Sequence, residues 1–328
     1  MQYIHIPDTD ITISPLGLGT SMAGVKWGKT AQEADEMFGT FLECGGNLID
    51  TAHVYSDWQV VDGVHEIARS ERVIGEWLSR SGKRDQIVLL TKGGHPDFSR
   101  PGADLHKNRC TKEDMRSDLE SSLQKLQTDY VDIYMYHRDD RNIPVEEMAG
   151  TMQEFVEEGK IRYWSVSNWN ADRMRAADAY CKKMGWRGPV ADEALMNAGS
   201  RHMKPLSDDT LVYVYGDSGL YDYHKENPGN LLIPYMGIAE GFFQKYLAGG
   251  AEAVGASSYA VPENLAFAER IPALMEKYEC SVMNVILGFF TQQPMTCVPL
   301  VGPRNVETIK DACRTFEIGF GPDILPEQ

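Results

Sequence analysis

The sequence of 328 residues has no excess of positive charge. It contains 48 acidic and 32 basic residues, which gives a formal net charge of −16. A protein with a net negative charge repels the phosphate backbones of nucleic acids and the headgroups of anionic membranes. We therefore expect neither a nucleic-acid partner nor binding to a membrane surface.

Long apolar runs and targeting signals are also absent from the sequence. A membrane-spanning helix needs about 18 or more consecutive apolar residues, and no run of that length occurs. The residues Met1–Pro7 lack the basic segment followed by an apolar run that is typical of a secretory signal. We expect a cytoplasmic protein.

The cysteines lack the paired short spacing that zinc sites and redox motifs require. The histidines outside the strand ends lack metal spacing such as His-x-His. We therefore predict no metal site, and six reduced and mostly buried thiols: Cys44, Cys110, Cys181, Cys280, Cys297 and Cys313.

What the sequence does contain is a regular alternation of short apolar runs and helical stretches. This alternation is typical of repeated βα units and a parallel sheet. No linker or shift in composition interrupts it, so we predict one domain over residues 1–328, a length that a single α/β barrel can occupy. The eight predicted strands are 14–19, 47–51, 86–92, 131–137, 161–167, 190–194, 231–235 and 297–302.

The expected helices have recognisable ends. Thr30 with Glu33 resembles a capping box, and Ser70, Thr111 and Pro144 stand where the first residues of helices are expected. Glycines at positions 45, 82, 159 and 185 are predicted to end helices before the next strand.

Two segments are longer than the regular spacing. Residues 196–230 are predicted to form loop structure with one short helix near 221–227, and residues 236–259 another long connection. Helical stretches at 262–278 and 281–292 precede the last strand. Long loops on one rim of a barrel usually shape a pocket.

Three neighbouring strands each end in one ionisable residue. Asp50, Lys92 and His137 each follow an apolar run, and Tyr55 lies on the loop five residues after Asp50. Because the carboxyl ends of barrel strands converge on one mouth, these four side chains can form one cluster.

Such a cluster suits proton transfer to an oxygen that gains charge when hydride reaches its carbon. Tyr55 can supply the proton, and an ammonium at Lys92 is expected to lower the tyrosine pKa toward the working range. Asp50 would pair with Lys92, and His137 could donate a hydrogen bond to the carbonyl oxygen.

The sequence resembles the aldo-keto reductase family. The matching motifs are Gly17-Leu18-Gly19-Thr20, Asn47 to Ala52 with Tyr55, Thr91-Lys92, Asp129 to Tyr134 with His137, Gly159 to Arg162, Ser165 to Trp169, and Val301 to Arg304. This resemblance implies a single (β/α)8 TIM barrel with long loops at the C-terminal rim. It also implies hydride transfer from nicotinamide, and catalysis by Asp50, Tyr55, Lys92 and His137 with Tyr55 as general acid.

The resemblance also implies a set of cofactor contacts. It places the carboxamide near Ser167 and Asn168 and the nicotinamide ring on Tyr235, with Gly19, Thr20 and Asp50 alongside. Departures from the family pattern are Glu193, where many relatives carry glutamine, Met236, where serine is frequent, and Asp311 and Ala312 near the adenine.

The last strand is followed by a candidate phosphate site. Gly302, Arg304 and Asn305 precede the final helix, whose free amides together with the Arg304 guanidinium suit a phosphate group. We therefore expect NADP(H) rather than NAD(H).

The substrate pocket is predicted from aromatic and polar residues on the loops. The expected lining residues are Trp27, Trp58, His95, Arg138 and Trp169. Such a lining suits a small-molecule carbonyl or polyol, including a sugar-like carbonyl.

Other functions remain open at this point. The chain could be a weakly catalytic NADP-binding regulatory subunit, or an epimerase that oxidises and re-reduces one substrate with retained cofactor. A metal held by Asp50, His53, His95 and His137, or a Schiff base on Lys92, is a weaker hypothesis. The sequence leaves the substrate, the reaction direction and the oligomeric state open.

Overall fold

A parallel eight-stranded sheet forms the centre of the protein in a computed structural model that describes residues 1–56, 60–61, 64–65, 69–97, 102 and 104–326. The order of its strands is β11-β10-β9-β8-β7-β4-β3-β12. At the outer edges of the sheet, Leu232 of β11 forms a bridge with Cys297, three residues before β12, which closes the sheet into a barrel. The strand bounds are β3 (Gly17–Gly19), β4 (Leu48–Asp50), β7 (Val88–Gly93), β8 (Val131–Tyr136), β9 (Ile161–Ser167), β10 (Ala191–Glu193), β11 (Leu231–Leu232) and β12 (Leu300–Val301).

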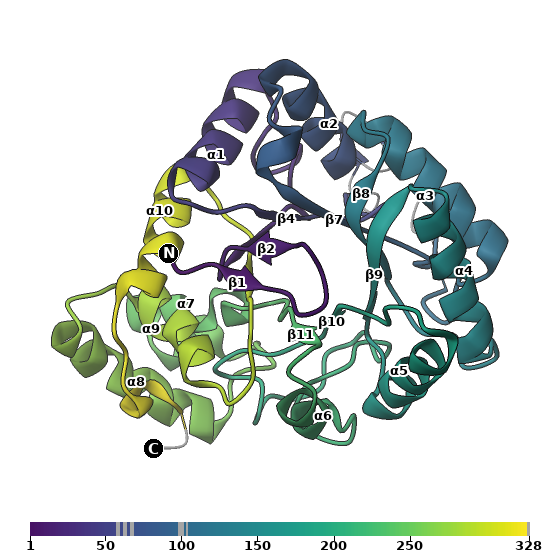
Figure 1. Cartoon of the computed structure of the whole chain (residues 1–328). Helices are drawn as coiled ribbons and strands as arrows, with labels where there is room; N and C mark the ends of the chain where they lie inside the picture. The colour runs from purple at the N-terminus through teal and green to yellow at the C-terminus, as the bar shows by residue number, and fades with distance from the viewer. Residues whose placement is uncertain (57–59, 62–63, 66–68, 98–101, 103, 327–328) are drawn as a thin grey trace.

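Each of the eight predicted strands overlaps one strand of this sheet, so the predicted (β/α)8 barrel is confirmed. Helices surround the barrel and cover the outer faces of its strands (Figure 1). Their bounds are α1 (Ala31–Glu43), α2 (Arg69–Ser81), α3 (Lys112–Leu126), α4 (Val145–Glu157), α5 (Ala171–Met184), α6 (Leu220–Glu226), α7 (Phe242–Gly249), α8 (Pro262–Lys277), α9 (Val282–Gly288) and α10 (Val306–Arg314).

The helix ends agree in part with the sequence signals. Thr30 and Thr111 cap α1 and α3 by accepting from the third amide of each helix, and the predicted terminal glycines 45, 82, 159 and 185 all have positive φ. Ser70 is the second residue of α2, and Pro144 directly precedes α4, as expected. One expectation is wrong in detail, because the Glu33 carboxylate accepts from the amide of Lys29 rather than closing a capping box.

A short hairpin that the sequence did not predict covers one end of the barrel. Its strands β1 (Ile4–His5) and β2 (Thr12–Ile13) lie across the barrel axis in Figure 1. Ile6, Ile11 and Ile13 are buried against the side chains that fill the barrel interior. Strands of two residues carry too little periodicity to be read from sequence.

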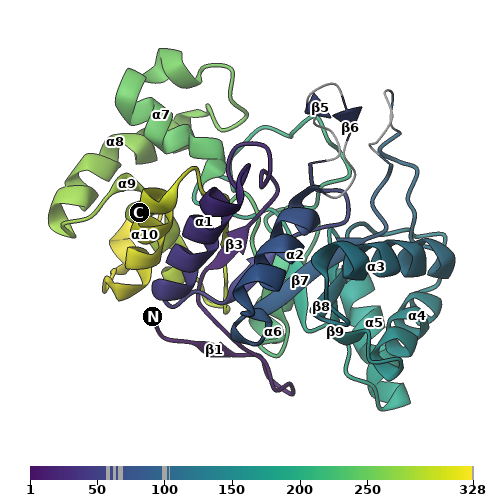
Figure 2. The same ribbon diagram turned by 90° about the horizontal axis from the view of Figure 1, so that it is seen from above.

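The opposite end of the barrel carries the long connections. Figure 2 shows α7 and the small hairpin of β5 (Val60–Val61) and β6 (Val64–His65) at the end away from β1. The predicted short helix in residues 196–230 is α6. The connection 236–259 contains α7 and short 3₁₀ turns, and so is more ordered than predicted.

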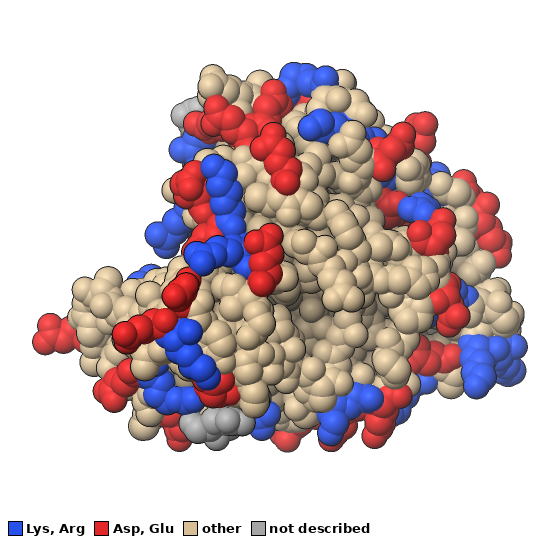
Figure 3. Space-filling model, turned by 60° about the vertical axis from the view of Figure 1, so that its left-hand side comes forward, with Lys and Arg blue, Asp and Glu red and all other residues tan. Residues whose placement is uncertain are grey.

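Charge is spread over the surface shown in Figure 3. Acidic and basic side chains are interspersed around the edges of this face, and its centre carries few charged side chains. Within the described residues, no helix has the length and apolar character needed to cross a membrane.

One carboxyl group is buried in the layer between barrel and helices. Glu71 on α2 is fully buried, and its Oε1 accepts a 2.6 Å hydrogen bond from Thr91 Oγ1 on β7. Burial raises the pKa of Glu71 to about 7, although the Thr91 bond opposes this shift. The protonated form is therefore the form that the fold favours.

We predict that Glu71→Gln changes how stability depends on pH. The Glu71 pKa is higher in the folded than in the unfolded chain. Protonated Glu71 therefore stabilises the fold in acid, and this stabilisation is lost as pH rises from about 4.5 to about 7. The free energy of unfolding of the wild type should fall relative to Glu71→Gln by up to about 3 kcal/mol over this range. Urea denaturation at several pH values measures the difference in free energy of unfolding between wild type and variant. Glu76→Gln, an exposed position on the same helix, is the matched control, and parallel curves for wild type and Glu71→Gln would contradict the prediction.

Candidate active site

Four predicted catalytic side chains meet at the carboxyl ends of β4, β7 and β8. These strands are neighbours in the sheet, so Asp50, Lys92 and His137 leave adjacent positions on one rim. Tyr55 lies on the loop after β4, and its ring centroid is 5.9 Å from that of His137. The structure thus brings together all four residues.

Lys92 is the hub of this cluster. Its side chain is fully buried, and Nζ donates to Asp50 Oδ1, to Thr51 O at 3.0 Å and to Tyr55 Oη at 3.0 Å. Tyr55 Oη also lies 3.4 Å from Asp50 Oδ2. One ammonium therefore fixes both the carboxylate and the phenol.

Glu193 brings a second carboxyl group to Lys92. It is the last residue of β10, it is buried, and its Oε2 lies 3.3 Å from Lys92 Nζ. Burial and the neighbouring Asp50 raise the pKa of Glu193 to about 8. Burial disfavours the Lys92 ammonium, but the two carboxyl groups outweigh it and raise the Lys92 pKa above its ordinary value.

The pKa of Tyr55 moves in the direction opposite to the one expected from the sequence. Burial and the Asp50 charge raise it, and the lowering effect of Lys92 is smaller. The phenol therefore holds its proton at neutral pH, which is the form that a general acid needs before it reacts.

His137 is held as a neutral imidazole. Burial, then the neighbouring His95 and Arg138, lower the pKa of His137 well below its ordinary value. The His95 ring lies 4.6 Å from it, and His95 Nδ1 lies 2.9 Å from Pro96 O, an acceptor that requires the proton on that nitrogen. A neutral His137 can donate a hydrogen bond to a substrate oxygen without adding charge.

Polar residues predicted to hold the nicotinamide surround the end of β9. Asn168 has a left-handed backbone (φ 60°), and its Nδ2 donates to Ser167 Oγ at 2.9 Å and to His137 O at 3.3 Å. Its Oδ1 accepts from Tyr235 Oη at 2.8 Å and from Val212 N at 3.0 Å. Asn168 thereby links the predicted carboxamide site to the strand that carries His137.

Two glycines leave open backbone at the ends of β3 and β12. These strands are paired, and a Cβ added at Gly302 would meet nothing nearer than 4.0 Å, while one at Gly19 would come no closer than 3.5 Å to Val301 O. Thr20 is buried, and its Oγ1 donates to Asp50 O at 2.7 Å. The glycines form a backbone surface that a large cofactor could approach closely.

The predicted phosphate residues lie beside these glycines. Arg304 is exposed and makes no hydrogen bond or ion pair with other described residues, and Asn305 caps α10 by accepting from Thr308 N. Asp311, expected near the adenine, accepts a hydrogen bond from Ser281 Oγ at 2.7 Å at the start of α9.

The predicted substrate residues are only partly together. Arg138 and His95 lie next to His137, and Arg138 lines a cavity of about 350 Å³ with polar residues of neighbouring loops. Trp27 and Trp169 are buried: Trp27 packs edge-on against Phe38, and Trp169 Nε1 donates to Arg138 O. Trp58 lies outside the described residues.

No group of three or more potential metal ligands occurs among the residues that the structure describes.

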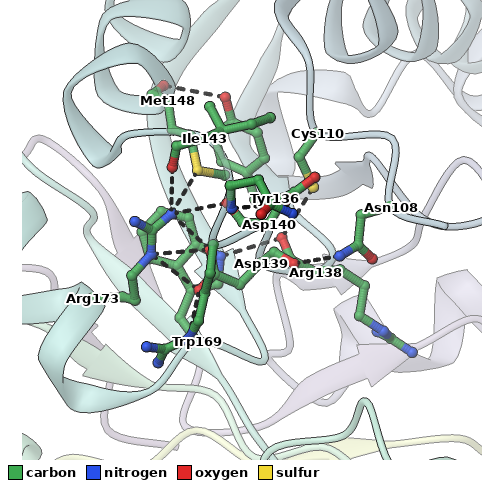
Figure 4. A network of polar contacts seen from close by, with 12 residues as sticks. Asn108, Cys110, Tyr136, Arg138, Asp139, Asp140, Ile143, Met148, Trp169 and Arg173 are labelled. Carbon is green, nitrogen blue, oxygen red and sulfur yellow. Dashed lines mark hydrogen bonds and ion pairs between the residues drawn. The ribbon is translucent and has the colours of Figure 1, made fainter. Parts of the chain in front are cut away.

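The loop that follows His137 is held by a pair that sequence reasoning missed. Arg173 on α5 donates to Asp139 through Nε at 3.0 Å and Nη2 at 2.8 Å, and also to Ile143 O at 3.1 Å. Figure 4 shows Arg173 reaching from α5 to this loop, with Trp169 alongside. Nothing in the local sequence signals the pair, because 34 positions separate its members.

We predict that Arg173→Met destabilises the protein by about 2 to 3 kcal/mol, since it leaves the mostly buried Asp139 with only the more distant and exposed Arg141, whose Nε lies 3.8 Å away, as a cation. Arg175→Met is the matched control on the same helix, because Arg175 and its partner Glu226 are exposed, and it should change stability by less than about 0.5 kcal/mol. Urea denaturation of the two variants and the wild type measures both changes in the free energy of unfolding. Equal effects of the two substitutions would show that the Arg173 pair does not hold the loop.

Comparisons with known proteins identify a family and a fold for the chain. The family model described as "Aldo/keto reductase family" matches residues 15–324. The chain is 37% identical to "Aldo-keto reductase YhdN" of Bacillus subtilis over 53% of this chain and 49% of that protein. It is 27% identical to "Uncharacterized oxidoreductase YrpG" of the same organism over 99% of this chain and 94% of that protein. A crystal structure of the thermostable aldo-keto reductase Tm1743 has the same fold, with a TM-score of 0.69 and 22% identity over 99% of this chain and 97% of that one.

Proposed function

The chain belongs to the aldo/keto reductase family, and on this basis we propose that it is an NADP(H)-dependent reductase with Tyr55 as the general acid. Family membership supports an oxidoreductase that interconverts a carbonyl and an alcohol. The observation that carries the finer proposal is the position of Tyr55, whose Oη lies 3.0 Å from the buried Lys92 ammonium and whose ring lies edge-on to His137 at 5.9 Å. The substrate would be an aldehyde, a ketone or a sugar-like carbonyl.

The proposed mechanism assigns one task to each side chain. When bound, the reduced nicotinamide supplies a hydride to the carbonyl carbon. Tyr55 gives its phenolic proton to the oxygen, which becomes the alcohol, and Lys92 stabilises the phenolate that remains. His137 donates a hydrogen bond to the same oxygen and so orients the carbonyl. Asp50 holds Lys92 in place.

The described residues fit a phosphorylated dinucleotide. The open backbone at Gly19 and Gly302 permits close approach, and Ser167, Asn168 and Tyr235 provide polar groups and a ring beside the cluster. Arg304, whose guanidinium has no hydrogen-bond or ion-pair partner among the described residues, stands next to the first turn of α10, where backbone amides favour anions. These features support NADP(H) over NAD(H).

We predict that Tyr55→Phe lowers kcat by roughly 100-fold or more while NADPH still binds, because only the transferred proton is removed. Turnover on a panel of aldehydes, ketones and sugars, with fluorescence titration of NADPH, measures both properties. Tyr3→Phe, at an exposed tyrosine, is the control and should leave both unchanged. Undiminished turnover by Tyr55→Phe would refute its role as the acid.

We predict that Arg304→Ala weakens NADPH binding by about 10-fold or more and changes NADH binding little, since only NADPH has the additional phosphate. Fluorescence titration with each cofactor measures the two affinities. Lys310→Ala, which removes a cation from within α10, is the control. An equal loss for the two cofactors would count against a specific phosphate contact.

A further inference from the structure

Glu193 faces the interior of the site because of its position in β10. Side chains alternate along a strand, so its neighbour Asp192 points to the other face. There Asp192 Oδ2 lies 3.2 Å from His224 Nε2, in a buried pair between β10 and α6. Glu193 points toward Lys92, which thus has one carboxyl group from β4 and another from β10.

The donors of Lys92 do not suffice for both carboxyl groups. An ammonium has three protons, and those of Lys92 are directed to Asp50, Thr51 O and Tyr55 Oη. Glu193 Oε2 lies 3.3 Å from Nζ but has no hydrogen-bond partner among the described residues. An ionised carboxylate in this buried position would lack the hydrogen bonds that normally offset burial.

We propose that Glu193 is a positioning residue for Tyr55 that acts through Lys92: it carries a proton in the resting site, and its charge state sets how readily Tyr55 ionises. With Glu193 protonated, the single charge of Lys92 is balanced by Asp50. When Glu193 releases its proton to solvent, a second negative charge appears beside the same ammonium and opposes formation of the phenolate. This inference rests on the proposed role of Tyr55.

The groups around Glu193 support this assignment. Asp50 from β4 and Asp192 from its own strand raise the Glu193 pKa, burial raises it most, and Lys92 from β7 lowers it. In turn, Glu193 raises the pKa of Tyr55 and also that of Tyr235, which follows β11.

The two reaction directions should respond differently to Glu193. Carbonyl reduction begins from the protonated phenol, which both charge states of Glu193 permit. Alcohol oxidation needs the phenolate as a base, and a charged Glu193 disfavours it. Rising pH should therefore assist oxidation less in the wild type than in a variant that cannot ionise at this position.

The first experiment compares alcohol oxidation by wild type and Glu193→Gln, a neutral replacement of the same shape. The ratio of kcat/KM, variant to wild type, should rise from about one near pH 6 to about 10-fold near pH 9.5, since one unit in the Tyr55 pKa is a tenfold change in phenolate. As a control, Glu226→Gln removes an exposed carboxyl group on α6, and its ratio should not vary with pH. A ratio for Glu193→Gln that is constant with pH would overturn the proposal.

The second experiment needs no turnover, so it separates this proposal from the proposed function. Carbon-13 NMR of the protein labelled at glutamate Cδ should show one carboxyl with a midpoint near pH 8 that is absent from Glu193→Gln, besides that of Glu71 near pH 7. The Glu71→Gln variant should lose the titration near pH 7. The titration near pH 8 can then be assigned to Glu193 even if Glu193→Gln fails to fold. If every glutamate other than Glu71 titrates below about pH 6, Glu193 does not store a proton and the inference is wrong.

Discussion

The buried ammonium of Lys92 is the interaction on which the site depends. Its contacts join the ends of β4, β7 and β10 and fix Tyr55 on the loop between barrel and solvent. Removing this one cation would leave the buried Asp50 carboxylate without its charge partner, which proteins tolerate poorly. The roles proposed for Tyr55, Asp50 and Glu193 therefore all depend on Lys92.

The rest of the fold keeps that unit in place. Barrel closure puts β4, β7, β8 and β10 on one curved sheet, so that side chains far apart in the sequence converge on one rim. The N-terminal hairpin fills the other end with Ile6, Ile11 and Ile13. Arg173 holds the loop after His137 and contacts the ring of Trp169, which follows Asn168. Packing on both sides thus limits movement of the catalytic strand ends.

Sequence reasoning predicted the repeated elements and the four-residue cluster, because apolar periodicity and strand-end polarity are local signals. It missed the β1–β2 hairpin, whose strands are too short to show a period, and the Arg173–Asp139 pair, which forms only when distant loops meet. It also gave the wrong direction for the Tyr55 pKa. The ammonium was visible in the sequence, but the extent of burial and the closeness of Asp50, which outweigh it, were not.

In the proposed reaction, Tyr55 supplies the proton as hydride reaches the carbonyl carbon. A single-turnover measurement of NADPH oxidation, with a carbonyl substrate in H2O and in D2O, is the sharpest test of this step. The wild type should be slower in D2O, and deuterium on the transferring carbon of NADPH should slow the same step. If the chemical step is slowed neither by D2O nor by deuterium on NADPH, Tyr55 does not supply the proton in this way.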